Sequence, residues 1–254
     1  MSLGRVAAIA RQDLRILRTD LMAIVPLIVL PLVVMPFLRP AFRAAFHFGG
    51  LHNATGAEQV VPGMAVTFGF FLVMNTSSSF FREHMWRTWD RLRASAAGPA
   101  EILLGKMVTP LVEFTVQFVL LFGLAGLLMD LHVRGSWLEL CAVGCAFAVF
   151  LVATGVAVTA VCRTYMQATA TVTAGALVMA GFAGALVPFA LLPPWAQAIS
   201  PLVPSYWAMQ GYKHAIFGGK PVVLPVLALL GFSLLSALVA AARFRFEDQK
   251  LGPT

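Results

Sequence analysis

Long apolar segments recur along the whole chain, and they constrain its fold more than any other feature. Each approaches or exceeds the ~20 residues that an α-helix needs to cross a bilayer. Only 11% of the residues are charged, whereas soluble domains carry about 25%. This deficit leaves too little polar surface to cover a soluble globule. We therefore expect an all-α membrane protein with six transmembrane helices, at residues 21–38, 60–80, 102–129, 137–161, 167–191 and 221–242.

The segment before the first apolar stretch, residues 2–19, is amphipathic at helical periodicity. One face of this helix carries Leu3, Val6, Ala7, Ala10, Leu14 and Leu17, and the opposite face carries Arg5, Arg11, Arg15 and Arg18. A basic amphipathic helix of this kind is typical of the membrane interface, where its apolar face enters the acyl boundary. We expect an interfacial helix, which is either a simple anchor or a mechanical element.

The distribution of cationic residues predicts the orientation of the chain. With the N-terminus in the cytoplasm, the expected outer segments hold five cations, Arg39, Arg43, Arg134, Lys213 and Lys220. The inner segments then hold thirteen: Arg5, Arg11, Arg15, Arg18, Arg82, Arg87, Arg91, Arg93, Lys106, Arg163, Arg243, Arg245 and Lys250. Cytoplasmic loops carry an excess of Lys and Arg, so both termini are predicted to be cytoplasmic. The net charge of +7 is explained by topology and lipid headgroups, and no nucleic-acid partner is expected.

Two polar or aromatic segments separate the expected spans. Residues 82–99 lie between the second and third spans, carry Trp86 and Trp89 among charges, and are expected to form a short cytoplasmic helix. Residues 192–220 lie between the fifth and sixth spans and combine prolines with aromatic residues. Aromatic residues at this density mark a membrane interface, so this segment is expected to re-enter the outer leaflet.

No phosphate-binding loop is visible in the sequence. The closest segment, residues 100–107, ends in Gly105-Lys106 but has Ala100 where the motif needs Gly, and Met107 where it needs Ser or Thr. Active transport would therefore draw its energy from another polypeptide or from an ion gradient. No catalytic, cofactor-binding or metal-binding residue is predicted in this chain.

The two segments also carry family motifs. Arg82-Glu83, then Thr88-Trp89-Asp90-Arg91-Leu92 and Leu104-Gly105-Lys106, is similar to the "RE…GT-x-E-R-L…GK" region of ABC-2 type permeases. Leu192-Pro193-Pro194-Trp195, then Ile199-Ser200-Pro201-Leu202 and Tyr206, is similar to their "P-x-W…P-L…Y" segment. The chain resembles this family over nearly its whole length, as a single domain of residues 1–254. Arg87 departs from the pattern, because the family usually has Gly there.

The resemblance implies a permease subunit that works with separate ATP-binding cassette subunits, in which ATP and Mg²⁺ bind. It places residues 82–99 as the coupling helix region that contacts the ATPase. The residues expected to make that contact are Glu83, Trp86, Thr88, Trp89, Asp90, Arg91 and Leu92. A second permease subunit, identical or different, is expected because six spans from one chain are too few to enclose a path for a bulky substrate.

A few polar residues within the apolar spans are candidates for a substrate path: Asn75, Ser78, Glu113 and Gln117. An unpaired charge within a span costs at least ~2.5 kcal/mol, so Glu113 needs a partner. One interpretation is a contact for a substrate or a gate. The alternative is a structural pairing with a polar residue of a neighbouring helix, such as the cluster at residues 75–79.

The predicted function is export of an amphipathic substrate, an antibiotic or natural product, across a bacterial inner membrane. Lipid or polysaccharide export by the same architecture is the first alternative. An ion-coupled secondary transporter is the second, although such proteins typically carry several embedded acids or repeated broken helices. Only Glu113 stands clearly inside an expected span.

Overall fold

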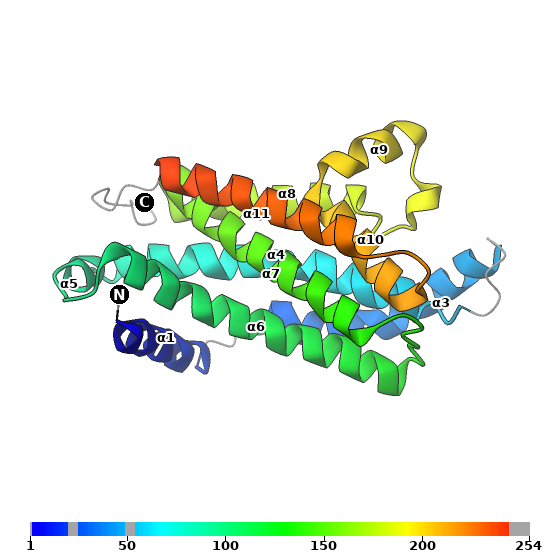
Figure 1. Cartoon of the computed structure of the whole chain (residues 1–254), viewed down its shortest axis with the longest axis horizontal. Coiled ribbons are helices and arrows are strands. Elements are labelled where there is room, and N and C mark those ends of the chain that lie inside the picture. Colours follow the sequence, from blue (N-terminus) through cyan, green and yellow to red (C-terminus); the bar gives the residue numbers. More distant parts are fainter. Residues whose placement is uncertain (1, 20–24, 49–53, 244–254) are drawn as a thin grey trace.

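The computed structural model describes residues 2–19, 25–48 and 54–243, and every regular element in these ranges is helical. Figure 1 shows long helices lying side by side, with short helices at the ends of the bundle. The helices are α1 (Leu3–Leu17), α3 (Leu30–Phe48), α4 (Ala57–Met85), α5 (Trp89–Arg93), α6 (Pro99–Leu128), α7 (Trp137–Val161), α8 (Tyr165–Phe182), α9 (Pro194–Ile199), α10 (Pro204–Phe217) and α11 (Val223–Arg243). A π-helical turn, η1 (Val25–Val29), leads into α3, and two 3₁₀ turns, η2 (Phe189–Leu191) and η3 (Ser200–Leu202), flank α9.

Five helical segments of the described chain are long and apolar enough to cross a membrane: Val25–His47, Ala57–Met85, Pro99–Leu128, Trp137–Val161 and Val223–Arg243. The structure therefore confirms an all-helical architecture with several apolar helices. Helix α8 occupies the position of the fifth expected span but is only 18 residues long and is not among the five. It ends at Phe182, and Gly184 follows with a left-handed backbone (φ +69°). The count of six spans stays a prediction.

Helix α3 extends further at its C-terminal end than the sequence predicts. Residues 39–59, between the first two expected spans, were expected to form an outer loop that could include short helical pieces, but α3 continues unbroken to Phe48 and contains both Pro36 and Pro40. Proline is tolerated in membrane helices when neighbouring groups satisfy the freed carbonyls. Helix α3 packs against α4, so the prediction of a loop over residues 40–48 was wrong.

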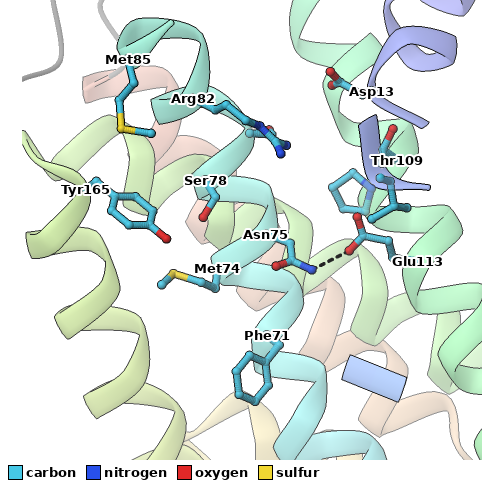
Figure 2. A pocket seen from close by; sticks show the side chains of 13 residues that line it. Asp13, Phe71, Met74, Asn75, Ser78, Arg82, Met85, Thr109, Glu113 and Tyr165 are labelled. Atoms are coloured by element: carbon cyan, nitrogen blue, oxygen red, sulfur yellow. Dashed lines mark hydrogen bonds between the residues drawn. The ribbon is translucent and has the colours of Figure 1, made fainter. Parts of the chain in front are cut away.

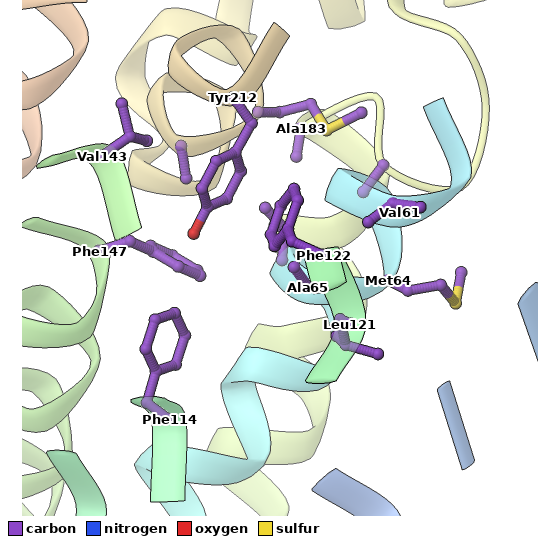
Figure 3. Close-up of a cluster of buried hydrophobic side chains, with 14 of the residues drawn as sticks. Val61, Met64, Ala65, Phe114, Leu121, Phe122, Val143, Phe147, Ala183 and Tyr212 are labelled. Carbon is purple, nitrogen blue, oxygen red and sulfur yellow. The ribbon is translucent and has the colours of Figure 1, made fainter. Parts of the chain in front are cut away.

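The core of the bundle forms around α4 and α7, which are the most buried of the long helices. Helix α11 packs along α7, and α10 contacts α4, α7 and α11. Tyr212 of α10 is fully buried beside Phe118 and Phe122 of α6 and Phe147 of α7; Figure 3 shows three of these four rings. The segment at residues 192–220 therefore forms short helices, and the second of them belongs to the core.

Helix α1 lies beside α6 (Figure 1). Its inward face buries Ala10 and Asp13, while Leu3 on the predicted apolar face is exposed. Placement of this helix in the membrane interface stays a prediction. The packing on α6 matters for the site because it brings α1 next to the connector between α4 and α6.

Candidate coupling junction and adjoining cavity

The connector begins with a sharp turn at the end of α4. Helix α4 ends at Met85, and Arg87 has a left-handed backbone with φ +54°. The Thr88 hydroxyl then donates a hydrogen bond to the carboxylate of Glu83, one turn back. L-residues with a Cβ are strained in the left-handed region, whereas glycine enters it freely. The turn explains why a glycine suits this position and why Arg87 is an unusual occupant.

The two tryptophans of the connector face different surroundings. Trp89, the first residue of α5, is buried in a cluster with Phe80 and Ile102. Its ring stacks on His84 with the centroids 4.6 Å apart. Trp86 is 57% exposed and lies 5.6 Å from the guanidinium of Arg82. Trp89 thus attaches α5 to the bundle, while Trp86 is presented outward together with the exposed Asp90 and Arg91.

A buried ion pair network holds the connector to α6 and α1. Lys106 of α6 is only 1% exposed, and its ammonium nitrogen lies 2.9 Å from Glu83 Oε1 and 3.4 Å from Asp13 Oδ2. The same group lies 3.4 Å from the carbonyl oxygen of Ser79 and 5.8 Å from the centre of the Phe80 ring. One cation therefore joins the end of α4, the start of α6 and the middle of α1. We call Lys106, Glu83 and Asp13 the ionic junction.

The ionic junction is costly to form and costly to break. Removing charges from water is compensated only when the partners are close and their remaining donors are satisfied. Burial raises the pKa of Asp13 above its ordinary value, and the opposing attraction of Lys106 is not sufficient to cancel that effect. Asp13 therefore lies on the inward face of α1 only because Lys106 is there to pair with it.

A second contact ties the first turn of α1 to the first turn of α6. Glu101 accepts hydrogen bonds from the backbone N–H groups of Ser2 at 2.5 Å and Gly98 at 3.0 Å, and Arg5 Nη1 lies 3.5 Å away. Between this contact and the ionic junction, Gly105 lets α1 approach α6 closely. A Cβ on Gly105 would lie 2.8 Å from the side chain of Ile9. Helix α1 is thus fixed to α6 at three successive levels.

A cavity of about 370 Å³ opens beside the ionic junction, between α1, α4, α6 and the start of α8. It brings together three of the four residues predicted for a substrate path, Asn75, Ser78 and Glu113. Figure 2 shows that Asn75 and Glu113 point toward one another across the gap between α4 and α6, and Asn75 Nδ2 donates to Glu113 Oε2 at 2.7 Å. The pairing of Glu113 with the polar cluster of α4 is therefore present. The fourth predicted residue, Gln117, is buried and does not line the cavity.

Three residues of this region were not among the predicted site residues: Asp13, Lys106 and Thr109. Asp13 sits at the boundary of the apolar face of an amphipathic helix, which is a sequence signal for a buried partner. Lys106 follows Gly105 in the family-like motif, but nothing in the sequence pairs it with α1. Thr109 lines the cavity one turn before Glu113, and its hydroxyl is buried without a hydrogen-bond partner in the described part of the chain.

Several apolar helices long enough to cross a bilayer, which bury a small number of polar and charged residues between them, define a multi-pass membrane protein. The chain belongs to the ABC-2 type transporter family, whose model matches residues 6–217. A comparison with curated proteins finds no match. Members of this family are the membrane permease components of ABC transporters and are not themselves catalytic.

Proposed function

We propose that the chain is the permease subunit of an ATP-driven exporter in a bacterial inner membrane, with six spans and both termini in the cytoplasm. Family membership implies association with an ATP-binding cassette subunit, which would hold ATP and Mg²⁺. A second permease subunit would complete the path. The proposed cargo is an amphipathic molecule such as an antibiotic or natural product.

The observation that carries this proposal is the architecture of the connector. Its outward surface presents Trp86, Asp90 and Arg91, while Trp89 and the ionic junction attach it to α1 and α6. Exposed aromatic and arginine side chains are over-represented among residues that dominate binding energy at interfaces. A force applied to Trp86 by a moving ATPase would pass through rigid, buried contacts into the spans. Thr88 and Leu92, which are half-buried, would shape the connector and not the contact surface.

The lining of the cavity supports an amphipathic cargo. Phe71 and Met74 provide an apolar wall, and Asn75, Ser78 and Glu113 provide polar groups in the same space. Lipid or polysaccharide export by the same architecture is the alternative within the family. A secondary transporter coupled to ions would instead transport without an ATPase. The observation that favours this second candidate is Glu113, an acid buried within a span.

The test is co-purification of the full chain from its native membrane, followed by identification of the accompanying protein and measurement of its ATPase activity. We expect an ATPase subunit to accompany the wild-type chain, and Trp86→Ala with Arg91→Ala to reduce its recovery at least about fivefold. Trp137→Ala is the matched control, because Trp137 is exposed to a similar extent (52%) at the start of α7, away from the connector.

Two outcomes would overturn the proposal. The first is transport by the purified chain that needs no ATP, which would favour the secondary transporter. The second is undiminished recovery of the ATPase with the double variant, which would remove the connector surface as the contact.

A further inference from the structure

The cavity beside the ionic junction has an apolar end at Phe71 and Met74, a polar band at Asn75, Thr109 and Glu113, and a second end that carries the charged side chain of Arg82 beside Met85. Its α4 wall runs from Phe71 to Met85, and Arg82 stands eleven residues, about 16 Å, from Phe71 along the helix axis. Figure 2 shows Phe71 at one end, Arg82 and Met85 at the other, and Asn75 facing Glu113 between them. A ligand that lies along this cavity would place its polar group beside Glu113 and an apolar part beside Phe71 and Met74.

The polar band is rich in hydrogen-bond acceptors. Glu113 is 7% exposed and Thr109 is 6% exposed, and one helical turn separates them on the same face of α6. The Thr109 hydroxyl makes no hydrogen bond within the described residues, although a buried hydroxyl normally has a partner. The carboxylate of Glu113 can only accept hydrogen bonds, and one N–H of the Asn75 amide already donates to it. A group that donates several hydrogen bonds can be accepted by both Glu113 and Thr109, whereas a group that only accepts would have no hydrogen to offer the Glu113 carboxylate.

Among the described lining residues, the other two charged side chains, Asp13 and Arg82, have partners of their own. Asp13 is held by Lys106 of the ionic junction. Arg82 lies at the end of the cavity beside the connector, with its guanidinium 5.6 Å from the ring of Trp86. At the level of Glu113, the described residues contribute its carboxylate, the hydroxyls of Ser78 and Thr109, and the amide of Asn75.

We propose that this cavity binds the ammonium group of a cationic amphiphile between Glu113 and Thr109, with the apolar part of the ligand against Phe71 and Met74. An ammonium group has three donors and no acceptor, which complements the band. A charge-assisted hydrogen bond to a buried carboxylate is about twice as strong as a neutral one. The inference names the substrate class of the proposed exporter and rests on that function for transport, but binding itself needs no ATPase.

The experiment measures binding to the full chain in lipid nanodiscs without any ATPase subunit. The probes are dansylcadaverine, which ends in a primary ammonium, its uncharged N-acetyl derivative, and dansyl-aminocaproate, which ends in a carboxylate. Dansyl fluorescence reports transfer to an apolar environment, and empty nanodiscs correct for partition into lipid. We expect saturable binding of dansylcadaverine at least about tenfold tighter than that of either analogue.

Variants then locate the ammonium. Glu113→Gln keeps an acceptor for Asn75 but removes the charge, and we expect about a tenfold loss of affinity for dansylcadaverine with no change for the N-acetyl derivative. Thr109→Val is nearly isosteric and should cost about threefold. Thr115→Val is the control, because Thr115 is exposed on α6 and its hydroxyl donates to the backbone of Leu111. Thermal unfolding of each variant in nanodiscs identifies any that fails to fold.

The inference is overturned if the three probes bind equally, or if both Glu113→Gln and Thr109→Val fold and bind dansylcadaverine as the wild type does. Tighter binding of dansyl-aminocaproate would also overturn it, since that result assigns the cavity to anions at Arg82. If Glu113→Gln does not fold, the result with Thr109→Val decides alone. If the chain binds no amine but still co-purifies with an ATPase, this inference fails and the proposed function stands. If the chain binds the amine but no ATPase accompanies it, the proposed function fails and this inference stands.

Discussion

The ammonium group of Lys106 lies 2.9 Å from a carboxylate oxygen of Glu83, at the two ends of the connector between α4 and α6. The pair closes the connector into a loop whose ends cannot separate without exposing a buried charge. Asp13 adds α1 to the same contact at 3.4 Å. The geometry of the connector is therefore set by charge pairing as well as by the packing of Trp89.

Replacing Lys106 with Met should destabilise the protein strongly. The change leaves the carboxylates of Glu83 and Asp13 close together without their shared cation, and breaking a buried pair typically costs about 3–5 kcal/mol. We expect a large fall in the midpoint of thermal unfolding in detergent micelles. Adding Glu83→Gln to Lys106→Met should recover part of the loss, because one uncompensated charge is removed.

Arg11→Met is the control for the junction, since Arg11 is an exposed cation on the same helix as Asp13. It should change the unfolding midpoint little, as surface charges generally do. A Lys106→Met protein as stable as Arg11→Met would show that the junction contributes nothing to the fold.

Replacing Arg87 with Gly should stabilise the connector. The backbone at Arg87 is left-handed, which costs a residue with a Cβ about 1–2 kcal/mol relative to glycine. The greater freedom of glycine in the unfolded chain offsets part of that gain. We expect a net increase of about 0.5–1 kcal/mol in the free energy of unfolding, measured by denaturant titration. Arg91→Gly, inside α5, should instead lose about 1 kcal/mol, and a loss in both variants would refute the strain argument.

Stability should rise as the pH increases above about 8 because of Lys213. This lysine lies on α10, outside the five candidate spans, and burial lowers its pKa from 10.5 to about 8. Between these two values the unfolded chain binds more protons than the folded chain, so the free energy of unfolding increases with pH. Lys213→Met should flatten the increase between pH 8 and pH 10 in thermal unfolding. Lys220→Met, at an exposed position, should retain it.

The sequence predicts the architecture well where a strong physical signal exists. Long apolar runs leave little choice but helices, and the fourth expected span, residues 137–161, coincides with α7. The amphipathic pattern of residues 2–19 likewise predicts α1 to within two residues at each end. The end of the first span was predicted less well: it was expected at residue 38, but packing against α4 carries α3 on to Phe48.

The site was only partly predictable, because its contacts join helices far apart in the sequence. Glu113 could be identified by the cost of an acid within an apolar segment, and its partner Asn75 by the polar cluster of the neighbouring span. The pairing of Lys106 with Asp13 joins residues 93 positions apart and has no local signal. The different environments of Trp86 and Trp89 depend on how α5 folds back onto the bundle, which their spacing does not reveal.

Gly105 has a consequence for how α1 can move. Because α1 rests directly on a position without a side chain, with Ile9 seated over Gly105, sliding α1 along α6 would drive Ile9 onto larger side chains one turn away on the same face of α6, Ile102 or Thr109. Tilting α1 about Gly105 would open either the contact of Glu101 with Ser2 and Arg5 or the ionic junction, which lie on the two sides of this point. We therefore expect α1 and the start of α6 to move as one rigid unit, so that any displacement of this end of α6 carries α1 with it.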